Sequence, residues 1–376
     1  MINLVFSYRA LRALSNIGAI PSAERVSKII VGGISESNRE RIEYNLPPFG
    51  DRPIRSLNLR SNGWVRLFSG NLRVEYKTGI IYSGFRPIYG STDGLYSKNP
   101  DIPPTRPADI FGRSYKGIEE AIILKSLRQN DYYHFLFEFV PKIEIIERAD
   151  IPLSVPAIVT RDLASQPFFV AAAELGLFGK RPVIIQNENE VIEAKRLYVA
   201  RADICSERQI RFPSKRLRNR PGIQGRDRIY ISRNGQTTRG RQIINEQELI
   251  ARLRPLGFSV IDPGTMPLAE QIACFSHASI VVGPHGAGLT NILFRYGAPM
   301  ALVEMINDTI KWNHHYFEIA THCGYFYRAT LNHTEPGDGQ TASAYADIGS
   351  VLTAVEQAIA WEISAYGDQV PLSDNP

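Results

Sequence analysis

The chain contains few cysteines: three in 376 residues, Cys205, Cys274 and Cys323. They are far apart, odd in number and form no Cys-x-x-Cys pair. This pattern argues against a disulfide framework or a zinc site, and it fits a reducing compartment.

The chain also lacks long apolar runs. No stretch approaches the roughly 18 apolar residues that a membrane span needs. Near the N-terminus, Arg9 and Arg12 interrupt the apolar residues where a signal peptide would be apolar throughout. We therefore expect a cytoplasmic protein, and a peripheral contact with the inner membrane face stays open.

A strong charge imbalance is absent as well. The 43 basic and 38 acidic residues leave a net charge of +5, which suits an anionic ligand but is too weak to indicate nucleic acid. Basic side chains are concentrated between Arg208 and Arg228. This stretch is interpreted either as a solvated linker face or as a patch that meets a phosphate or a phospholipid head group.

The length favours two domains, and the 44% hydrophobic content is that of a chain with full cores. Residues 1–115 are rich in turn formers and predict irregular structure with a few strands.

From about residue 118 the pattern becomes α/β. We predict strands over 121–124, 157–160 and 183–186, an extended segment over 191–200, and helices over 131–148 and 167–177. Residues 1–205 are thus expected to form an acceptor-side domain, and 206–226 a basic linker.

The second half alternates more regularly. We predict strands over 228–232, 258–261, 279–282, 300–304 and 325–329. Helices are expected after Asn245, which caps with Glu248 three residues on, and over 268–276, from about Gly288, over 313–322 and over 348–364. Residues 227–345 are therefore predicted to be a nucleotide-sugar-binding, Rossmann-like domain, and 346–376 a C-terminal helix and tail. In doubly wound sheets, ligands bind at the carboxyl ends of the strands.

A glycine-rich turn follows one of these strands. The residues GPHGAGLTN at 283–291 come between a predicted strand and a predicted helix. Gly286, Ala287 and Gly288 would bring backbone N–H groups and a helix N-terminus to a phosphate, and His285 could donate to the same group. The alternative is a turn that serves packing alone. The turn does not have the GxGxxG spacing of a dinucleotide site.

Two arginines follow the strand at 228–232. Arg233 comes directly after it, and Arg241 lies in the polar loop beyond. A guanidinium binds two phosphate oxygens at once, so both are candidate diphosphate ligands. The alternative is that they are surface arginines paired with carboxylates such as Glu246.

An ionisable pair lies in the first predicted long helix. His134 and Glu138 are four residues apart among aromatic and aliphatic residues, and so share one helix face. Either one could be the base that deprotonates an acceptor hydroxyl. The alternative is a contact that only anchors the helix.

Two further residues are donor-site candidates. Glu304, at the end of a predicted strand, and Asn291 could hold a ribose or sugar hydroxyl, and Glu304 could instead cap a helix or form a salt bridge. The sequence has no Asp-x-Asp motif, and His314, His315 and His322 do not share one helix face, so we expect no metal and no cofactor. Charge on a leaving diphosphate would then be met by the arginines, the helix N-terminus and His285.

These segments resemble glycosyltransferase family 61. The resemblance rests on DYYHFLFEFVPK at 131–142, IYISR at 229–233, IINE at 243–246, EQ at 270–271 and GPHGAGLTNILF at 283–294, over about residues 118–305. The family's histidine motif usually reads His-Trp, whereas position 135 here is Phe; the later carboxylate is kept as Glu138.

The resemblance implies an α/β fold of the GT-B type, with two Rossmann-like domains facing across a cleft. It implies an inverting, metal-independent transfer of a sugar from a nucleotide diphosphate donor. With no anchor and few cysteines, the chain is similar to bacterial capsule or exopolysaccharide members. The expected acceptor is a glycan, free or lipid-linked, and the oligomeric state stays open, a homodimer included. Two alternatives are a pyruvyltransferase-type enzyme that modifies polysaccharide, and an inert protein that binds glycan or nucleotide on the same fold.

Overall fold

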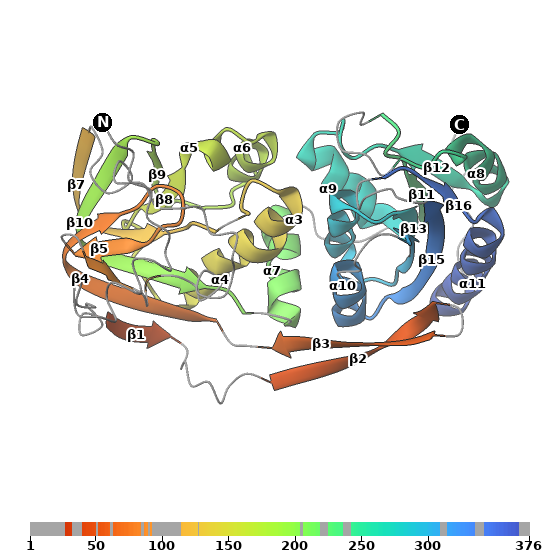
Figure 1. Cartoon of the computed structure of the whole chain (residues 1–376), viewed down its shortest axis with the longest axis horizontal. Coiled ribbons are helices and arrows are strands. Elements are labelled where there is room, and N and C mark those ends of the chain that lie inside the picture. Colours follow the sequence, from red (N-terminus) through yellow and green to blue (C-terminus); the bar gives the residue numbers. More distant parts are fainter. Residues whose placement is uncertain are drawn as a thin grey trace. The chain divides into compact units, whose positions relative to one another are not determined.

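The computed structural model describes most of the chain from residue 63 onward and three earlier strands. The described residues are 27–31, 40–49, 52–60, 63–83, 86–88, 91, 114–126, 128–203, 206–218, 225–235, 242–308, 314–334 and 342–367. The chain divides into two compact units (Figure 1). Unit 1 comprises Met1–Glu40 and Arg60–Ile204, and unit 2 comprises Arg41–Leu59 and Cys205–Pro376.

Unit 1 is built on one eight-stranded sheet. Its order is β6-β5-β4-β10-β7-β8-β9, and β1 pairs with β4. The strands are β1 (Ser27–Val31), β4 (Trp64–Val74), β5 (Ile81–Ser83), β6 (Arg86–Ile88), β7 (Ser114–Ile123), β8 (Ala157–Thr160), β9 (Val183–Gln186) and β10 (Glu190–Arg201). Strands β10, β7, β8 and β9 are mutually parallel, whereas β10, β4, β5 and β6 pair antiparallel.

The helices of unit 1 follow the parallel strands. They are α3 (Tyr132–His134), the π-helical turn η4 (Phe135–Phe139), α4 (Val140–Arg148), α5 (Arg161–Ala164) and α6 (Pro167–Glu174). The predicted α/β alternation from residue 118 is confirmed. The expectation of a Rossmann-like sheet is wrong for the antiparallel part. Strand β4 pairs with the edge of β10 that does not face β7, and its apolar residues contribute to the core of the sheet.

Unit 2 holds a six-stranded sheet of order β12-β11-β13-β14-β15-β16. Its strands are β11 (Asp227–Ile231), β12 (Phe258–Ile261), β13 (Ala278–Pro284), β14 (Ala301–Asn307), β15 (Phe326–Thr334) and β16 (Ala344–Ala346). All neighbours are parallel except β16, which pairs antiparallel with β15. Numbered from β11, the parallel strands lie in the doubly wound order 2-1-3-4-5. A separate two-stranded sheet pairs β2 (Glu40–Phe49) with β3 (Arg52–Arg60).

Helices cover both faces of the sheet of unit 2 (Figure 1). They are α7 (Glu207–Leu217), α8 (Glu246–Leu253), the 3₁₀ turn η5 (Arg254–Leu256), α9 (Leu268–His277), the 3₁₀ helix η6 (Ala287–Arg295), α10 (His315–Cys323) and α11 (Ile348–Tyr366). Because both faces are covered, every residue of β13 and β14 is buried, as in a central parallel strand. On the face of α8 and α11, Tyr230, Val282 and Val303 pack against residues of both helices.

Three local expectations are wrong in detail. The stretch 206–226 contains α7, whose Ser206 Oγ accepts from the N–H of Gln209 at 3.2 Å. This Ser-x-x-Gln spacing is a capping signature within the expected linker. Asn245 precedes α8, but its amide pairs with the backbone of Ala346 and does not cap the helix. The helix that begins at Ala287 is 3₁₀, so it is wound more tightly than an α-helix.

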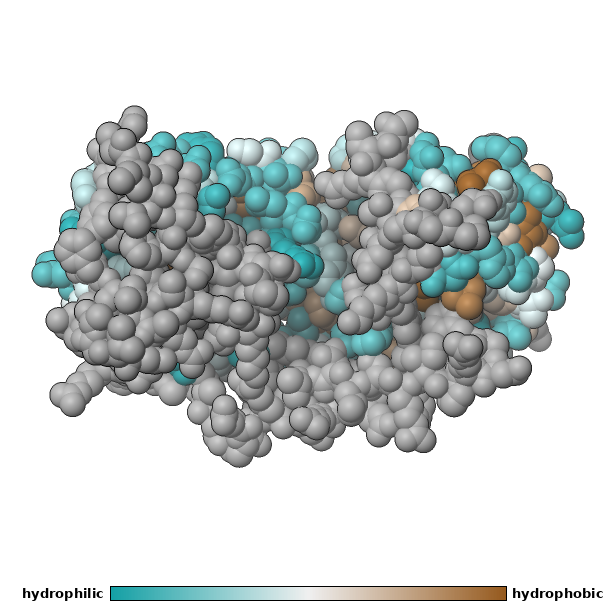
Figure 2. Space-filling model, viewed as in Figure 1, coloured by the Kyte–Doolittle hydropathy of each residue, from teal (hydrophilic) through white to brown (hydrophobic). Residues whose placement is uncertain are grey.

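The described surface of unit 2 carries apolar side chains among hydrophilic ones. Figure 2 shows them as brown patches on the visible face, and exposed apolar residues of this unit include Ile244, Val260, Tyr345 and Ile363. Single exposed apolar residues are normal on a protein surface. Within the described residues, no helix has the length and apolar character to cross a bilayer.

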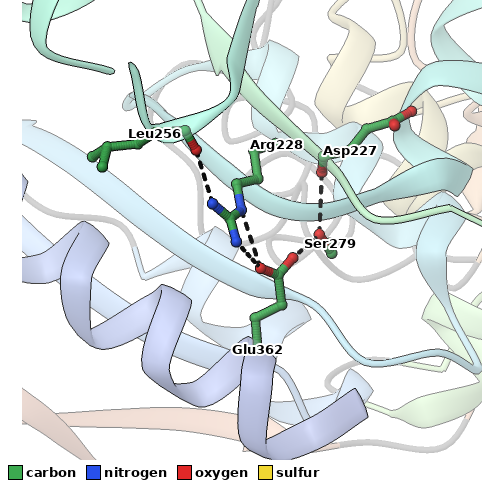
Figure 3. A network of polar contacts seen from close by, with 5 residues as sticks. All are labelled: Asp227, Arg228, Leu256, Ser279 and Glu362. Atoms are coloured by element: carbon green, nitrogen blue, oxygen red, sulfur yellow. Dashed lines mark hydrogen bonds and ion pairs between the residues drawn. The ribbon is translucent and has the colours of Figure 1, made fainter. Parts of the chain in front are cut away.

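An ion pair fastens α11 to the start of β11 (Figure 3). Arg228 donates to Glu362 Oε2 from Nη2 at 2.6 Å and from Nε at 3.1 Å, and its Nη1 donates to the Leu256 carbonyl at 2.8 Å. Ser279 Oγ, at the start of β13, also bonds the Glu362 carboxylate. Glu362 is 3% exposed, so one buried carboxylate joins a helix to two strands.

We predict that Glu362→Ala destabilises the protein by about 3 kcal/mol, because it leaves a largely buried guanidinium without its carboxylate. Chemical unfolding followed by circular dichroism measures the change. Glu356→Ala, an exposed position on the same helix, is the control and should stay within about 0.5 kcal/mol of the wild type. Equal stability of the two variants would contradict this account.

Candidate functional site

The site in unit 2 lies where the strand order reverses. Strands β11 and β13 are parallel neighbours, and β12 and β14 extend the sheet in opposite directions from them. Arg233 lies just beyond β11, and His285 follows β13 directly. The Arg233 Nη1 group donates to the His285 carbonyl at 2.9 Å. The structure therefore brings together two residues that are 52 positions apart in sequence.

Gly286 leaves room for the Arg233 guanidinium in its present position. A Cβ atom on Gly286 would lie 1.9 Å from Arg233 Nη1 and 2.9 Å from Cζ. The backbone at Gly286 is extended (φ 162°), so space and not conformation opposes a side chain there. At Gly283 the constraint is a Cβ contact of 2.8 Å with Ile231, whereas Gly288 has only ordinary contacts from 3.5 Å.

Glu246 organises the segment after β11. Tyr230 Oη donates to its carboxylate at 3.1 Å, and the Ser232 side chain and the Arg233 backbone also bond it. Burial raises the pKa of Glu246, and these hydrogen bonds oppose the rise. The alternative that Glu246 pairs with a surface arginine is thus not what the structure shows: Glu246 is buried and holds the turn that carries Arg233. The residue expected beside it, Arg241, lies outside the described residues.

His285 and Glu304 form a buried pair. His285 Nδ1 donates to Glu304 Oε1 at 2.5 Å, and the Tyr327 hydroxyl donates to Glu304 Oε2 at 2.6 Å. Glu304 is fully buried, and both of its oxygens are engaged. The expectation that Glu304 meets a sugar or ribose hydroxyl does not agree with this geometry, because the carboxylate faces His285 and Tyr327 inside the protein.

Asn291 is also an internal residue. It is fully buried, and its Nδ2 donates to Gln271 Oε1 at 2.7 Å and to the Gly288 carbonyl at 3.1 Å. The side chain therefore ties η6 to α9, and the sugar contact expected for it does not fit its burial. Ala287 and Gly288, half-buried at the start of η6, remain placed for backbone contacts with a ligand.

The pair in unit 1 forms as the four-residue spacing predicts. His134 Nδ1 lies 2.8 Å from Glu138 Oε1, and the side chains are 18% and 32% exposed. The backbone between them is the π-turn η4, a rare form that is frequent at functional sites. Lys142 anchors the helix beyond: its buried Nζ donates to the Lys125 carbonyl and to Ser126 Oγ, just after β7.

The basic stretch is in part structural. Arg228 pairs with the buried Glu362, and Arg218 donates to the carbonyls of Phe294 and Tyr296 at the end of η6. These two arginines therefore do not belong to an open basic face. Among the described residues, no cluster of three or more His, Cys, Asp or Glu side chains is arranged to hold a metal ion.

Residues 132–303, a little under half of the chain, match the family model of Glycosyltransferase 61. The matched region contains the His134–Glu138 pair, Arg233 and the glycine-rich turn. The resemblance to glycosyltransferase family 61 is thereby confirmed over these residues, and the protein is a glycosyltransferase.

None of the curated proteins matches the chain. One solved structure that aligns with it is the dodecameric iron-containing heptosyltransferase TibC in complex with ADP-D-beta-D-heptose. The TM-score is 0.34 and the identity 11%, covering 80% of this chain and 94% of that one. A likeness at this TM-score carries no conclusion.

We predict that Gly286→Ala moves the Arg233 guanidinium away from the His285 carbonyl, because the new Cβ would occupy its place. The end of a flexible side chain moves easily, so the free energy of unfolding should fall by only about 1 kcal/mol. Crystal structures and unfolding curves of Gly286→Ala and of the control Gly288→Ala measure both effects. An unmoved guanidinium in Gly286→Ala, or an equal displacement in Gly288→Ala, would refute this account.

Proposed function

We propose that this protein is an inverting, metal-independent glycosyltransferase that moves a sugar from a nucleotide diphosphate donor to a glycan acceptor. The donor is proposed to bind unit 2, and the acceptor is proposed to be activated by unit 1. In this proposal the two units work as a GT-B enzyme, facing each other across a cleft, and the product belongs to a surface polysaccharide.

The observation that carries the proposal is the juxtaposition of Arg233 and His285 at the β11–β13 switch point. Ligands of doubly wound sheets bind at this position. A guanidinium supplies a fixed positive charge, and the first N–H groups of η6, at Ala287 and Gly288, have no partner within their own helix. Together these groups suit the two phosphates of a nucleotide sugar.

We propose that the charge of the departing nucleoside diphosphate is stabilised by these same groups. Hydrogen-bond donors and cations that are already in place before the reaction stabilise a developing negative charge without reorganisation. Arg233 is held by its bond to the His285 carbonyl, and the turn that carries it is held by Glu246.

We propose His134 as the base that deprotonates the acceptor hydroxyl. With Nδ1 engaged by Glu138, the ring keeps one orientation, and its Nε2 is free to accept a proton. Among the described residues none bonds Nε2, and this atom is not buried. Glu138 then orients the ring and stabilises its protonated form, the role of the carboxylate in a hydrolase triad. The acceptor hydroxyl would lose its proton to Nε2 as its oxygen attacks the sugar.

The donor site is tested with a thermal-shift screen of nucleoside diphosphates and diphosphate sugars in the presence of EDTA. At about 100-fold excess over Kd, a ligand stabilises by about 2.7 kcal/mol. We predict that one nucleotide class raises Tm without metal and that Arg233→Ala abolishes the shift.

Arg252→Ala, an exposed position on α8, is the control and should keep the full shift. A shift that needs a divalent ion would overturn the metal-independent proposal. No shift with any nucleotide, together with a shift by phosphoenolpyruvate, would favour the pyruvyltransferase alternative.

For the base, we predict that His134→Asn lowers kcat by about 10² to 10⁴ with little change in donor affinity, because the proton acceptor is lost. Glu138→Gln should cost about tenfold, since the amide oxygen still orients the ring but carries no charge. Initial rates with the donor identified in the screen measure both effects.

Glu174→Gln, an exposed carboxylate on α6, serves as the control. A loss in Glu138→Gln that exceeds the loss in His134→Asn would make Glu138 the base. Full activity of both variants would rule out the pair as catalytic.

A further inference from the structure

Both the backbone and the ring of His285 are held by contacts with other parts of unit 2. Its backbone N–H donates to the Met305 carbonyl at 2.8 Å, and its own carbonyl accepts from Arg233. The ring of Tyr316 packs edge-on against the imidazole, with centroids 5.1 Å apart. Glu304 then engages Nδ1. These contacts come from three parts of the chain, namely β14, the segment after β11 and α10, and together they give the ring one orientation.

The carboxylate behind the ring is itself fixed. Tyr327 donates to the second oxygen of Glu304, and the ring of Phe317 packs edge-on against Tyr327 at 5.1 Å. A carboxylate without water is costly unless it is paired and hydrogen-bonded. Glu304 meets this condition with one phenol and one imidazole. An imidazolium at position 285 would give this carboxylate a partner of opposite charge.

The other ring nitrogen is available to a ligand. In the described parts of the chain no group hydrogen-bonds His285 Nε2. This atom is also not fully buried. The nitrogen therefore keeps contact with solvent, although the residue as a whole is only 6% exposed. His285 lies in the turn that continues into Gly286, Ala287 and Gly288, whose backbone N–H groups belong to the proposed donor site.

We propose that His285 binds the donor diphosphate as an imidazolium, with Glu304 at Nδ1 and a phosphate oxygen at Nε2, so that binding takes up one proton. Glu304 and Tyr327 are the positioning residues of this arrangement. The inference rests on the proposed donor site in unit 2 and adds a protonation state and two residues to it.

The proton on His285 Nε2 stabilises the leaving diphosphate during sugar transfer. The bond between the sugar C1 and the β-phosphate oxygen breaks, and its electron pair stays on that oxygen. The acceptor oxygen forms the new bond to C1, and its proton passes to the base proposed in unit 1. The Nε2–H group of His285 donates to the diphosphate throughout, so the growing negative charge meets a cation that is already in place.

Other charged and titratable groups near the ring are consistent with this assignment. Arg233 is cationic and opposes a second positive charge in the empty site. Burial lowers the pKa of His314, and Glu304 offsets part of that effect. Tyr316 and Tyr327 are neutral near pH 7. Glu318 lies on α10 with Tyr316, and burial raises its pKa to about 7. Among the described residues, Glu304 is the carboxylate that bonds the ring of His285, and the ligand would bring a second anionic group.

Isothermal titration calorimetry with UDP, GDP, ADP and CDP tests the proposal. Each titration is run at pH 8 in buffers of different ionisation enthalpy, where the terminal phosphate is already ionised. The slope of the observed enthalpy against the buffer enthalpy gives the protons taken up. We expect uptake of about one proton with the nucleotide that binds, and a Kd that rises by up to about tenfold per pH unit above pH 8.

Three variants decide the source of the proton. His285→Gln keeps an amide near the position of Nε2 but does not titrate, so uptake should vanish while weaker binding persists. Glu304→Gln keeps the hydrogen bond without the charge and should also lose the uptake; if it does not fold, His285→Gln alone decides. His277→Gln, which changes an exposed histidine at the end of α9, should keep the wild-type value.

The outcomes separate the two proposals. Binding without proton uptake, or uptake that is unchanged in His285→Gln, overturns this inference and leaves the donor site standing. Absence of binding by every nucleoside diphosphate overturns the donor site and this inference with it.

Discussion

The parallel pairing of β11 with β13 is the constraint on which the candidate donor site depends. It places the segment that ends in Arg233 beside the segment that ends in His285. The Arg233 guanidinium then bonds the His285 carbonyl and occupies the space that a Cβ of Gly286 would take. On either side of this pair the sheet continues in opposite directions, so the connections leave the pair toward opposite faces. Ligands of doubly wound sheets bind outside the carboxyl ends of such a strand pair.

Three buried carboxylates hold the elements around this pairing. Glu362 joins α11 to β11 and β13, Glu246 holds the turn beyond β11, and Glu304 orients the ring beyond β13. Each accepts hydrogen bonds from at least two groups, which is the condition for keeping a carboxylate in the interior. Two of the three act on the residues of the candidate site, so the scaffold and the proposed chemistry share one polar framework.

The two units carry similar devices. Each has a histidine whose Nδ1 is engaged by a carboxylate, and in each the Nε2 atom stays accessible. The surroundings differ: Glu138 is a third exposed, whereas Glu304 is fully buried and has a phenol as its second partner. A partly exposed pair can exchange protons with a substrate and solvent, whereas a fully buried carboxylate can orient the ring but cannot meet a substrate. This difference is why we assign base chemistry to His134 and leaving-group stabilisation to His285.

Local patterns in the sequence were sufficient to predict most elements from residue 118 onward, because apolar periodicity and turn residues act over a few positions. They also predicted the His134–Glu138 contact, which depends only on helical spacing, and the family. They did not predict the long strand β4 as the partner of β10, the helix α7, or the partners of Asn245 and Asn291. They gave no sign of Tyr327 and did not identify Glu246 and Glu304 as buried supports, since each role depends on a residue from a distant strand. The sequence by itself thus determined the helices and strands and the side chains that follow the strand ends, such as Arg233 and His285. Tertiary structure alone decided which groups meet, because pairing across a sheet and burial of a charge depend on contacts that no local pattern encodes.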